Sequence, residues 1–329
     1  MLPRRRLGRT DIEVSRLGLG GLFVSKFGGD RAGSIQAIQR ALDLGINYID
    51  TAPTYGDSEE VLGEALAGTG RQLVLSTKIG GRPEPFLARD RSCLLAGIKG
   101  SLQRLRRDRV DILMIHEPDR PGQYDWWDDL VTPRGPVLDL LQELKRDGMV
   151  RAIGIGGTTA YQLARLVDTG LFDVVLTAFQ FSLLWREAEV ALIPAARNTG
   201  TGLIIGSPLQ QGALARRWDD PVRAGAPWLS PPRRAQFLEL YQLLDDIGMP
   251  LPELALRFAL SHSTVDCVLT GARSPREVEL NVAAALAGPL SDELLERLQR
   301  IADMVPFRPD SEPFFLPFGR EWSGLGAAM

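Results

Sequence analysis

The feature that most constrains this chain is an alternation of short apolar, β-prone runs with segments of helical periodicity, repeated eight times along 329 residues. The helical pattern is clear at 33–44, where Ile35, Ile38 and Ala41 recur on one face. Strand–helix repeats of this kind favour a parallel sheet covered by helices. Eight of them in this length predict a single (β/α)8 barrel domain that spans residues 1–329.

The predicted strands lie at 16–19, 47–50, 73–77, 110–115, 150–155, 174–177, 202–205 and 265–269. The predicted helices lie at 33–44, 59–67, 92–106, 136–146, 160–169, 188–198, 232–246, 251–262 and 275–286. The alternative is an open doubly wound sheet, which normally carries G-x-G-x-x-G after its first strand. Here Gly18, Gly20 and Gly21 spell only GLGG, so the barrel is favoured.

Two connections, at 117–135 and 214–230, are too long to be simple turns. Long loops on a barrel commonly shape its functional site. A C-terminal extension, 289–329, begins with a predicted helix at 292–304. It ends in an aromatic tail with Phe307, Phe314, Phe315, Phe318 and Trp322. This tail is too apolar for a solvated end, so we expect it to pack on the barrel.

Composition argues against several classes of protein. A net charge of −3 gives no overall basic field for nucleic acid. No apolar run approaches the roughly 20 residues of a membrane span. Arg4, Arg5 and Arg6 precede no apolar stretch, so we expect a solvated terminus and no secretory signal. With two cysteines and two histidines, we predict no metal site and a reducing, cytoplasmic location. The sequence leaves the oligomeric state open.

Four polar residues follow predicted strands: Asp50, Tyr55, Lys78 and His116. If those strands are parallel neighbours, the four side chains converge at the carboxyl edge of the sheet, where barrel enzymes place their chemistry. A tyrosine beside a lysine and a histidine can serve as a proton donor. The lysine charge, with an aspartate behind it, can lower the phenol pKa from about 10 toward working pH.

Each of these four residues has a plainer interpretation when taken alone. Asp50 suits a turn or a helix cap, and Tyr55 suits a half-buried surface ring. Lys78 would ordinarily be solvated, and His116 would ordinarily be a core residue. Their joint placement favours a catalytic group.

The run GINYIDTAPTYG, which contains Asp50 and Tyr55, resembles the signature of the aldo-keto reductases. The runs LVLSTK and DILMIHEPD, which contain Lys78 and His116, match the third and fourth catalytic positions of that family. The opening LGRTDIEVSRLGLGG and the late segments SPLQQGAL and LTGARSPREVELN extend the resemblance over nearly the whole chain.

This resemblance implies a (β/α)8 barrel that binds NADPH or NADH without a Rossmann fold and moves hydride between the nicotinamide and a small carbonyl or alcohol. Tyr55 would donate a proton to the carbonyl oxygen in reduction, or accept it in oxidation. Lys78, paired with Asp50, would depress the pKa of Tyr55, and His116 would orient the substrate oxygen.

The resemblance also implies a cofactor site across the barrel mouth. Ser207, Leu209 and Gly212 match the family's pyrophosphate loop, where backbone N–H groups suit phosphate oxygens. Gly21 is assigned to the same site. The adenosine segment is matched by Gly271, Arg273, Ser274, Arg276, Glu277 and Asn281. Its two arginines lie at a predicted helix start, where a phosphate would offset their charge, so NADP(H) is favoured and NAD(H) stays open. The plainer interpretation is two solvated arginines.

The chain also departs from the family pattern. Gly156 and Gly157 stand where the family commonly has serine and asparagine, and Thr158 would substitute for the missing side chains. Phe181 is expected to stack on the nicotinamide, while Gln180 is shifted by two places from the usual glutamine. These departures are similar to the branch that holds sugar and pyridoxal dehydrogenases.

Aromatic residues near the loops are candidates for the substrate pocket. We expect Phe23, Trp126, Trp127 and Trp228 to wall an apolar or sugar-stacking pocket. The alternative for Trp126 and Trp127 is a loop clamp that packs on the barrel. Two other functions also stay open: a non-catalytic regulatory nicotinamide-binding subunit, and a barrel hydrolase that uses Asp50 or another carboxylate.

Overall fold

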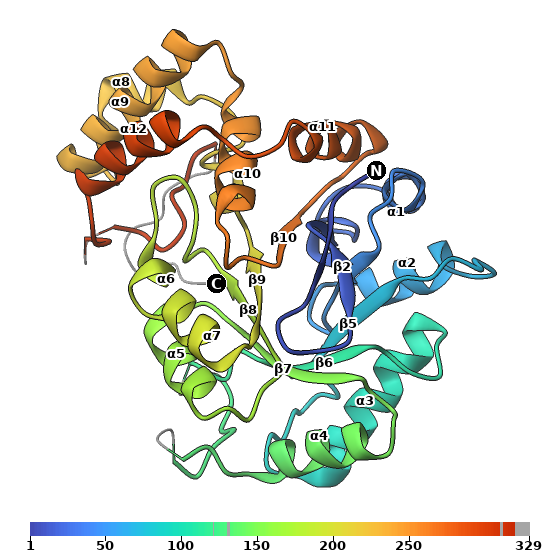
Figure 1. The fold of residues 1–329 in the computed structure, drawn as a ribbon. Coiled ribbons are helices and arrows are strands. Elements are labelled where there is room, and N and C mark those ends of the chain that lie inside the picture. The colour runs from blue at the N-terminus through green and yellow to red at the C-terminus, as the bar shows by residue number, and fades with distance from the viewer. Residues whose placement is uncertain (121, 130–131, 310–311, 320–329) are drawn as a thin grey trace.

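The computed structural model describes residues 1–120, 122–129, 132–309 and 312–319. Eight parallel strands close into a barrel in the order β10-β3-β4-β5-β6-β7-β8-β9 (Figure 1), which confirms the predicted (β/α)8 fold. The strands are β3 (Leu17–Gly20), β4 (Tyr48–Asp50), β5 (Val74–Ile79), β6 (Ile112–His116), β7 (Ala152–Gly157), β8 (Val174–Ala178), β9 (Gly202–Gly206) and β10 (Cys267–Thr270).

Helices follow the strands and form the outer layer. They are α1 (Arg31–Asp43), α2 (Ser58–Ala65), α3 (Arg91–Leu105), α4 (Pro136–Arg146), α5 (Ala160–Asp168), α6 (Glu187–Val190), α7 (Leu192–Thr199), α10 (Leu251–Ser261) and α11 (Pro275–Leu286). Local signals set their ends. The Asp30 side chain accepts the Gly33 N–H at the start of α1, and Gly148 and Gly170, each with φ 71°, follow α4 and α5.

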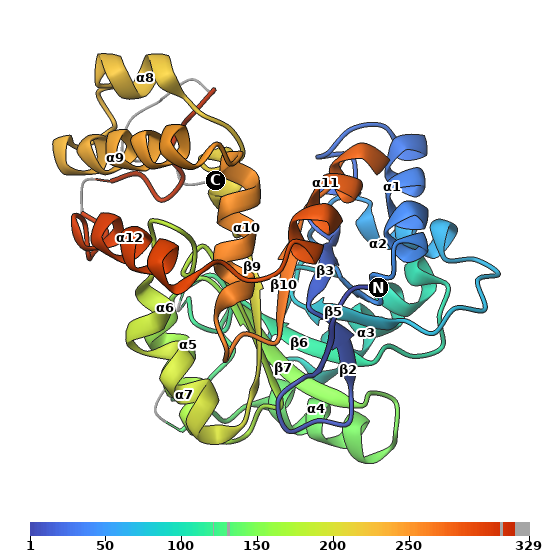
Figure 2. The ribbon, with the colours of Figure 1, turned by 45° about the horizontal axis from the view of Figure 1, so that its top comes forward.

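Three further helices, α8 (Asp219–Ala224), α9 (Pro231–Ile247) and α12 (Asp292–Asp303), gather on one side of the barrel beside α10 (Figures 1 and 2). The short helix α8 lies within the segment 214–230 that was expected to be a loop. In the parts of the chain that the structure describes, no helix is both long and apolar enough to cross a membrane.

Arg4 and Arg6 are exposed, as expected for a solvated start, but the N-terminal segment as a whole is built into the fold. β1 (Arg4–Arg6) and β2 (Glu13–Ser15) pair as an antiparallel hairpin. Leu7 and Ile12, between the two strands, and Val14, in β2, are fully buried and belong to the cluster that fills the barrel interior. Arg5 Nε lies 2.9 Å from the Asp266 carboxylate. The hairpin therefore plugs the barrel, and Arg5 is held by a residue far away in the sequence.

The pleat of the strands decides which residues face the barrel axis. Ile112 and Met114 of β6 belong to the interior cluster, so His116, two residues on, faces inward as well. By the same alternation Asp50 and Lys78 are the last inward residues of β4 and β5. The corresponding inward residues of β7, β8 and β9 are small: Gly156, Ala178 and Gly206. Three neighbouring strands, β4 to β6, thus end in polar inward side chains, and the next three, β7 to β9, end in nothing larger than a methyl group.

Candidate active site

The structure brings the four predicted catalytic residues together. Lys78 Nζ donates to Asp50 Oδ2 at 2.6 Å and to the Thr51 carbonyl at 2.8 Å. The same ammonium lies 4.8 Å from the centroid of the Tyr55 ring. The ring of Tyr55 meets that of His116 edge-on, with centroids 5.8 Å apart. The phenol therefore lies between an ammonium and an imidazole at the carboxyl end of the barrel.

Two residues that sequence reasoning missed extend this cluster into the barrel. Ser76 Oγ donates to Asp50 Oδ1 at 2.6 Å, and the Tyr48 hydroxyl lies 2.9 Å from Ser76 Oγ. Tyr48 and Ser76 lie two residues before Asp50 and Lys78 on the same strands. Because side chains two residues apart on a strand face the same side, this spacing would have predicted both residues. With both oxygens of Asp50 bound, the carboxylate is fixed behind Lys78.

Burial sets the protonation of the phenol. It raises the pKa of Tyr55, and the charge of Lys78 opposes this rise without reversing it. The sequence had suggested a lowered pKa, and the difference arises because desolvation penalises the phenolate more than Lys78 stabilises it. Burial also opposes the charge of Lys78, but Asp50 and Tyr55 outweigh it and hold the lysine pKa above its ordinary value. Tyr55 is thus protonated at neutral pH.

His116 is uncharged at neutral pH. Burial, together with the charges of Lys78 and Arg120, lowers its pKa to about 3. Its Nδ1 lies 3.4 Å from the Thr54 hydroxyl, and its carbonyl accepts the indole N–H of Trp126 at 3.2 Å. A neutral imidazole can orient a carbonyl oxygen without competing with the phenol as the acid.

The loop after β9, which was assigned to a pyrophosphate, has an unusual backbone. Ser207, Gln210 and Gln211 have φ near 50°, and Gly212 has φ 106°. Nothing lies within 4 Å of where a Cβ of Gly212 would stand, so the backbone is open on that side. Gln210, which the sequence did not single out, ties this loop to the one after β8, because its Nε2 donates to the Phe179 carbonyl at 3.0 Å. Leu209 is half-buried in the same loop.

The segment assigned to adenosine forms the start of α11. Ser274 Oγ accepts the Glu277 N–H, while the Glu277 carboxylate accepts the Arg273 N–H at 2.7 Å. This arrangement is similar to a capping box, except that the glutamate accepts from the residue before the N-cap. Asn281 Nδ2 reaches the Gly271 carbonyl at 3.5 Å. Glu277 thus stabilises the start of α11. The sequence had suggested only that it binds the cofactor.

Phe23 belongs with this segment rather than with the other predicted pocket residues. The Arg273 guanidinium lies 5.1 Å from the centroid of its ring, and a Cβ on Gly271 would come within 2.4 Å of the ring. Gly21 is buried, and a Cβ there would come within 2.7 Å of the Asp50 carbonyl. The close approach of two backbones accounts for that glycine.

The residues after β7 and β8 are tightly held. Thr158 Oγ1 accepts from Arg120 Nε at 2.7 Å, and Gln180 Oε1 accepts the Ala160 N–H at 3.3 Å. Phe181 is 1% exposed and packs against Phe258 of α10. The structure therefore places Phe181 in the packing of a helix, and the small Gly156–Gly157 pair remains the distinctive feature of this half of the mouth.

The adjacent tryptophans pack as a loop clamp. Trp126 is 1% exposed and packs edge-on against Tyr124. Trp127 donates its indole N–H to the Pro118 carbonyl at 3.1 Å and meets Phe172 near the start of β8. Both indoles are buried in the packing of the loop. Trp126 and Trp127 therefore hold the loop on the barrel and do not form a wall of a substrate pocket.

Part of the C-terminal tail contacts the barrel, whereas Phe307, which we also expected to pack, is 64% exposed. Phe314 and Phe315 meet Phe179, the residue after β8, at centroid distances of 5.4 and 4.9 Å. Trp228 packs against Phe318 of the tail at 4.8 Å. Trp322 lies outside the described residues. The tail phenylalanines thus reach the carboxyl end of the barrel, where Trp228 only supports the tail.

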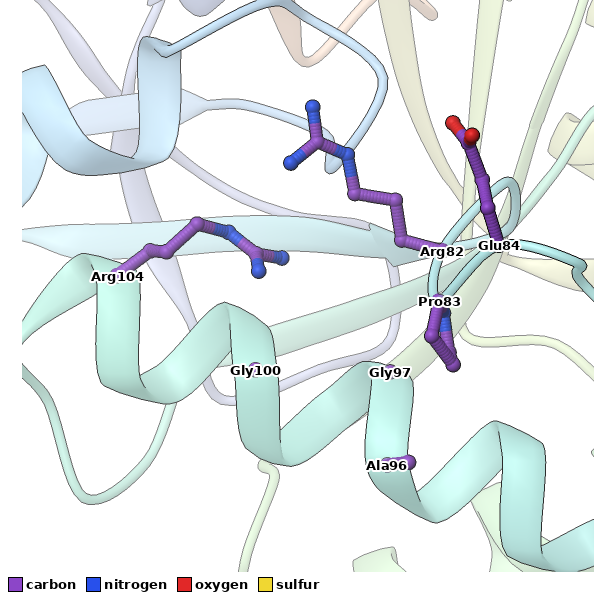
Figure 3. Close-up of a pocket in the computed structure, with 7 residues that line it drawn as sticks. All are labelled: Arg82, Pro83, Glu84, Ala96, Gly97, Gly100 and Arg104. Atoms are coloured by element: carbon purple, nitrogen blue, oxygen red, sulfur yellow. The ribbon is translucent and has the colours of Figure 1, made fainter.

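A separate hollow of about 320 Å³ lies between the loop after β5 and α3 (Figure 3). It is lined by Arg82, Pro83, Glu84, Ala96, Gly97, Gly100 and Arg104. The Arg104 guanidinium is engaged by the buried Glu59 carboxylate at 2.8 Å. None of the four clustered residues lines this hollow. Among the described residues, no group of three or more His, Cys, Asp or Glu is placed to hold a metal ion.

Comparison with known proteins agrees with this geometry. The family model described as "Aldo/keto reductase family" matches residues 16–303. The chain is 32% identical to the NADH-specific methylglyoxal reductase of Escherichia coli, over 89% of this chain and 98% of the relative. It is also 32% identical to the L-galactose dehydrogenase of Arabidopsis thaliana, over 85% of this chain and 87% of the relative.

A solved structure shares the fold. Aldo-keto reductase AKR11C1 from Bacillus halodurans, in its holo form, superposes with a TM-score of 0.75 at 27% identity, covering 95% of this chain and all of that one. The relatives are oxidoreductases that act on carbonyl compounds and sugars. With its barrel and its matched motifs, this chain belongs to the aldo/keto reductase family.

Proposed function

We propose that the chain is a nicotinamide-dependent oxidoreductase that interconverts a small carbonyl compound and its alcohol, with Tyr55 as the proton donor or acceptor. The observation that carries this proposal is the position of the Tyr55 phenol between Lys78 and His116, both buried, at the carboxyl end of the barrel. No other clustered group in the described residues offers a protonated acid, a buried cation and a neutral imidazole together.

In the direction of reduction, the Tyr55 hydroxyl gives its proton to the carbonyl oxygen while that oxygen gains electron density. Lys78 stabilises the phenolate left behind, and Asp50 keeps Lys78 charged and fixed. His116 holds the carbonyl oxygen toward the phenol through one ring nitrogen. In oxidation the phenolate takes the alcohol proton back.

The residues present fit a nicotinamide dinucleotide. Gly156, Ala178 and Gly206 place no side chain larger than a methyl group at the barrel mouth, and the open backbone at Gly212 suits phosphate oxygens. When bound, a reduced nicotinamide would supply the hydride that the carbonyl carbon receives.

We further propose NADP(H) as the preferred cofactor. Arg273 is exposed at the start of α11 and lies over Phe23. Among the described residues, the ion pair of Arg276 is with Glu279, at 3.7 Å. Both guanidinium groups are therefore available to a 2′-phosphate. The E. coli relative is NADH-specific by name, so the proposed preference for NADP(H) rests on Arg273 and Arg276 of this chain and not on that relative. Arg273→Ala is expected to weaken binding of NADPH and to leave binding of NADH unchanged.

The decisive experiment measures nicotinamide absorbance with a panel of aldehydes, ketones and sugars for wild type and Tyr55→Phe. The variant should lose about 10²- to 10⁴-fold in kcat, because it lacks the proton, while its affinity for the nucleotide is retained. A variant that turns over as fast as wild type would refute Tyr55 as the acid. Tight nucleotide binding without turnover of any substrate would favour the regulatory subunit instead, and cofactor-free cleavage of an ester or glycoside would favour a hydrolase.

A further inference from the structure

Glu117, directly after His116, has a backbone conformation that is unusual for a residue with a side chain. Its φ is 50°, and its N–H donates to the Gly156 carbonyl at 2.6 Å. In a continuing strand Glu117 would face away from the barrel axis, because successive side chains alternate. The left-handed conformation costs about 1–2 kcal/mol and is retained mainly where a site requires it. Here it redirects the glutamate.

The Glu117 carboxylate interacts electrostatically with the candidate active site. Burial is the main cause of the raised pKa of Tyr55, and the charge of Glu117 adds a small contribution in the same direction. The charge of Lys78 acts on Glu117 in turn. The side chain is only 17% exposed, and its ion pair with Arg120 Nη1 is 3.9 Å long, beyond hydrogen-bonding distance. The Gln123 side chain hydrogen-bonds to it, and the charges of Asp119 and Lys78 also act on it. A carboxylate has about four acceptor positions, so this one retains capacity for a donor from a ligand.

Arg120 is held beside Glu117 from two directions. Its Nε donates to Thr158 Oγ1 at 2.7 Å, and its guanidinium lies 5.3 Å from the centroid of the Phe314 ring in the tail. These contacts fix the plane of the guanidinium and use one of its five N–H donors. An acceptor and a donor therefore lie next to each other, one to four residues after His116.

Polar and aromatic groups alternate around this position. Glu117 and Arg120 supply hydrogen bonding, while Phe314 supplies an apolar face next to Arg120. A polyhydroxylated molecule presents the matching surfaces, because its C–H faces pack on aromatic rings and its hydroxyl groups both donate and accept.

We infer that Glu117 and Arg120 determine substrate specificity by binding a hydroxyl group next to the reacting carbonyl or alcohol carbon, so that the substrate is a hydroxylated carbonyl compound of the sugar class. This inference rests on the proposed function. The hydroxyl donates to the Glu117 carboxylate and accepts from the Arg120 guanidinium. A substrate without that hydroxyl leaves a partly buried carboxylate without its donor, which costs binding.

The test compares two aldehydes of equal chain length, glyceraldehyde and propanal, with NADPH and NADH. The measured quantity is the ratio of kcat/KM for glyceraldehyde to that for propanal. For Glu117→Gln we expect this ratio to fall by at least about tenfold relative to wild type, mainly through KM for glyceraldehyde. Arg120→Met, which keeps an apolar stem against Phe314, should lower the ratio as well. The matched control is Glu239→Gln, the same chemical change at an exposed residue of α9, which should leave the ratio unchanged.

The outcomes separate the two claims. If wild type reduces both aldehydes through Tyr55 but Glu117→Gln keeps the wild-type ratio, the specificity assignment is wrong and the proposed function stands. A wild-type ratio near one would also overturn it, without depending on any variant. If wild type reduces neither aldehyde with either nucleotide and oxidises no sugar, the proposed function fails, and this inference fails with it.

Discussion

Glu312 of the C-terminal tail and Arg233 of α9 form an ion pair of 2.7 Å between Nε and Oε2, with both side chains 1% exposed. Trp185 donates its indole N–H to the same carboxylate at 2.8 Å, and the Arg233 guanidinium lies 4.5 Å from the Trp185 ring. The pair fixes the tail two residues before Phe314. It therefore anchors the aromatic segment that packs on Phe179 at the carboxyl end of the barrel.

Removing one partner of this pair should release the tail. Glu312→Gln removes the carboxylate that is paired directly with the buried Arg233 guanidinium, so we expect a loss of about 3–5 kcal/mol in the stability of the docked tail. Limited proteolysis should then cut the tail faster than in wild type, with the barrel left intact. The control is Asp246→Asn, which removes an exposed partner of Arg297 and should cost less than about 1 kcal/mol. Equal proteolysis of Glu312→Gln and wild type would show that the pair does not anchor the tail.

The buried pair of Lys78 and Asp50 makes a second prediction. Asp50→Asn removes the charge that offsets the burial of Lys78, so the pKa of Lys78 should fall and the protein should lose about 3–5 kcal/mol of unfolding free energy. Urea denaturation measures this loss, and steady-state kinetics should show a lower kcat. The double variant Asp50→Asn with Lys78→Met removes both charges. It should regain much of the stability without regaining activity, and a double variant no more stable than Asp50→Asn would contradict the argument.

The buried imidazole of His116 should make the stability of the protein depend on pH. His116 has a pKa of about 3 in the folded protein and about 6.5 when unfolded. Above about pH 6.5 the imidazole is neutral in both states, so it does not make the unfolding free energy depend on pH. Below that pH the unfolded chain binds a proton that the folded protein does not, so stability falls as pH falls, by up to about 1.4 kcal/mol per pH unit.

His116→Asn removes this dependence. Between pH 7 and pH 5, wild type should lose about 2 kcal/mol more unfolding free energy than the variant, measured by urea denaturation at each pH. The other histidine, His262, is present in both proteins, so its own titration cancels. A difference that does not change with pH would mean that His116 becomes protonated inside the folded protein.

Much of the fold could be predicted because its signals are local. The apolar periodicity and the N-terminal proline of 136–146 give the bounds observed for α4. The four catalytic candidates could be found because each follows a β-prone run, and parallel strands bring their carboxyl ends to one edge. Tyr48 and Ser76 carried the same alternating signal, two residues earlier on their strands.

What the sequence could not determine depends on residues far apart in the chain and on burial. Phe23 lies with Gly271 and Arg273 because β3 and β10 are neighbours in the closed barrel. Arg5 is paired with Asp266 for a related reason: the N-terminal hairpin plugs the barrel interior.

The sequence by itself determined the barrel, the order of its eight strand–helix repeats and the chemical identity of the candidate active site. Only the tertiary structure decided that Trp126 and Trp127 are buried, that the backbone of Glu117 is left-handed, and that the pKa of Tyr55 is raised rather than lowered. The physical reason is that side-chain desolvation and ion pairing depend on how closely distant segments pack, and that packing exists only when the barrel is closed.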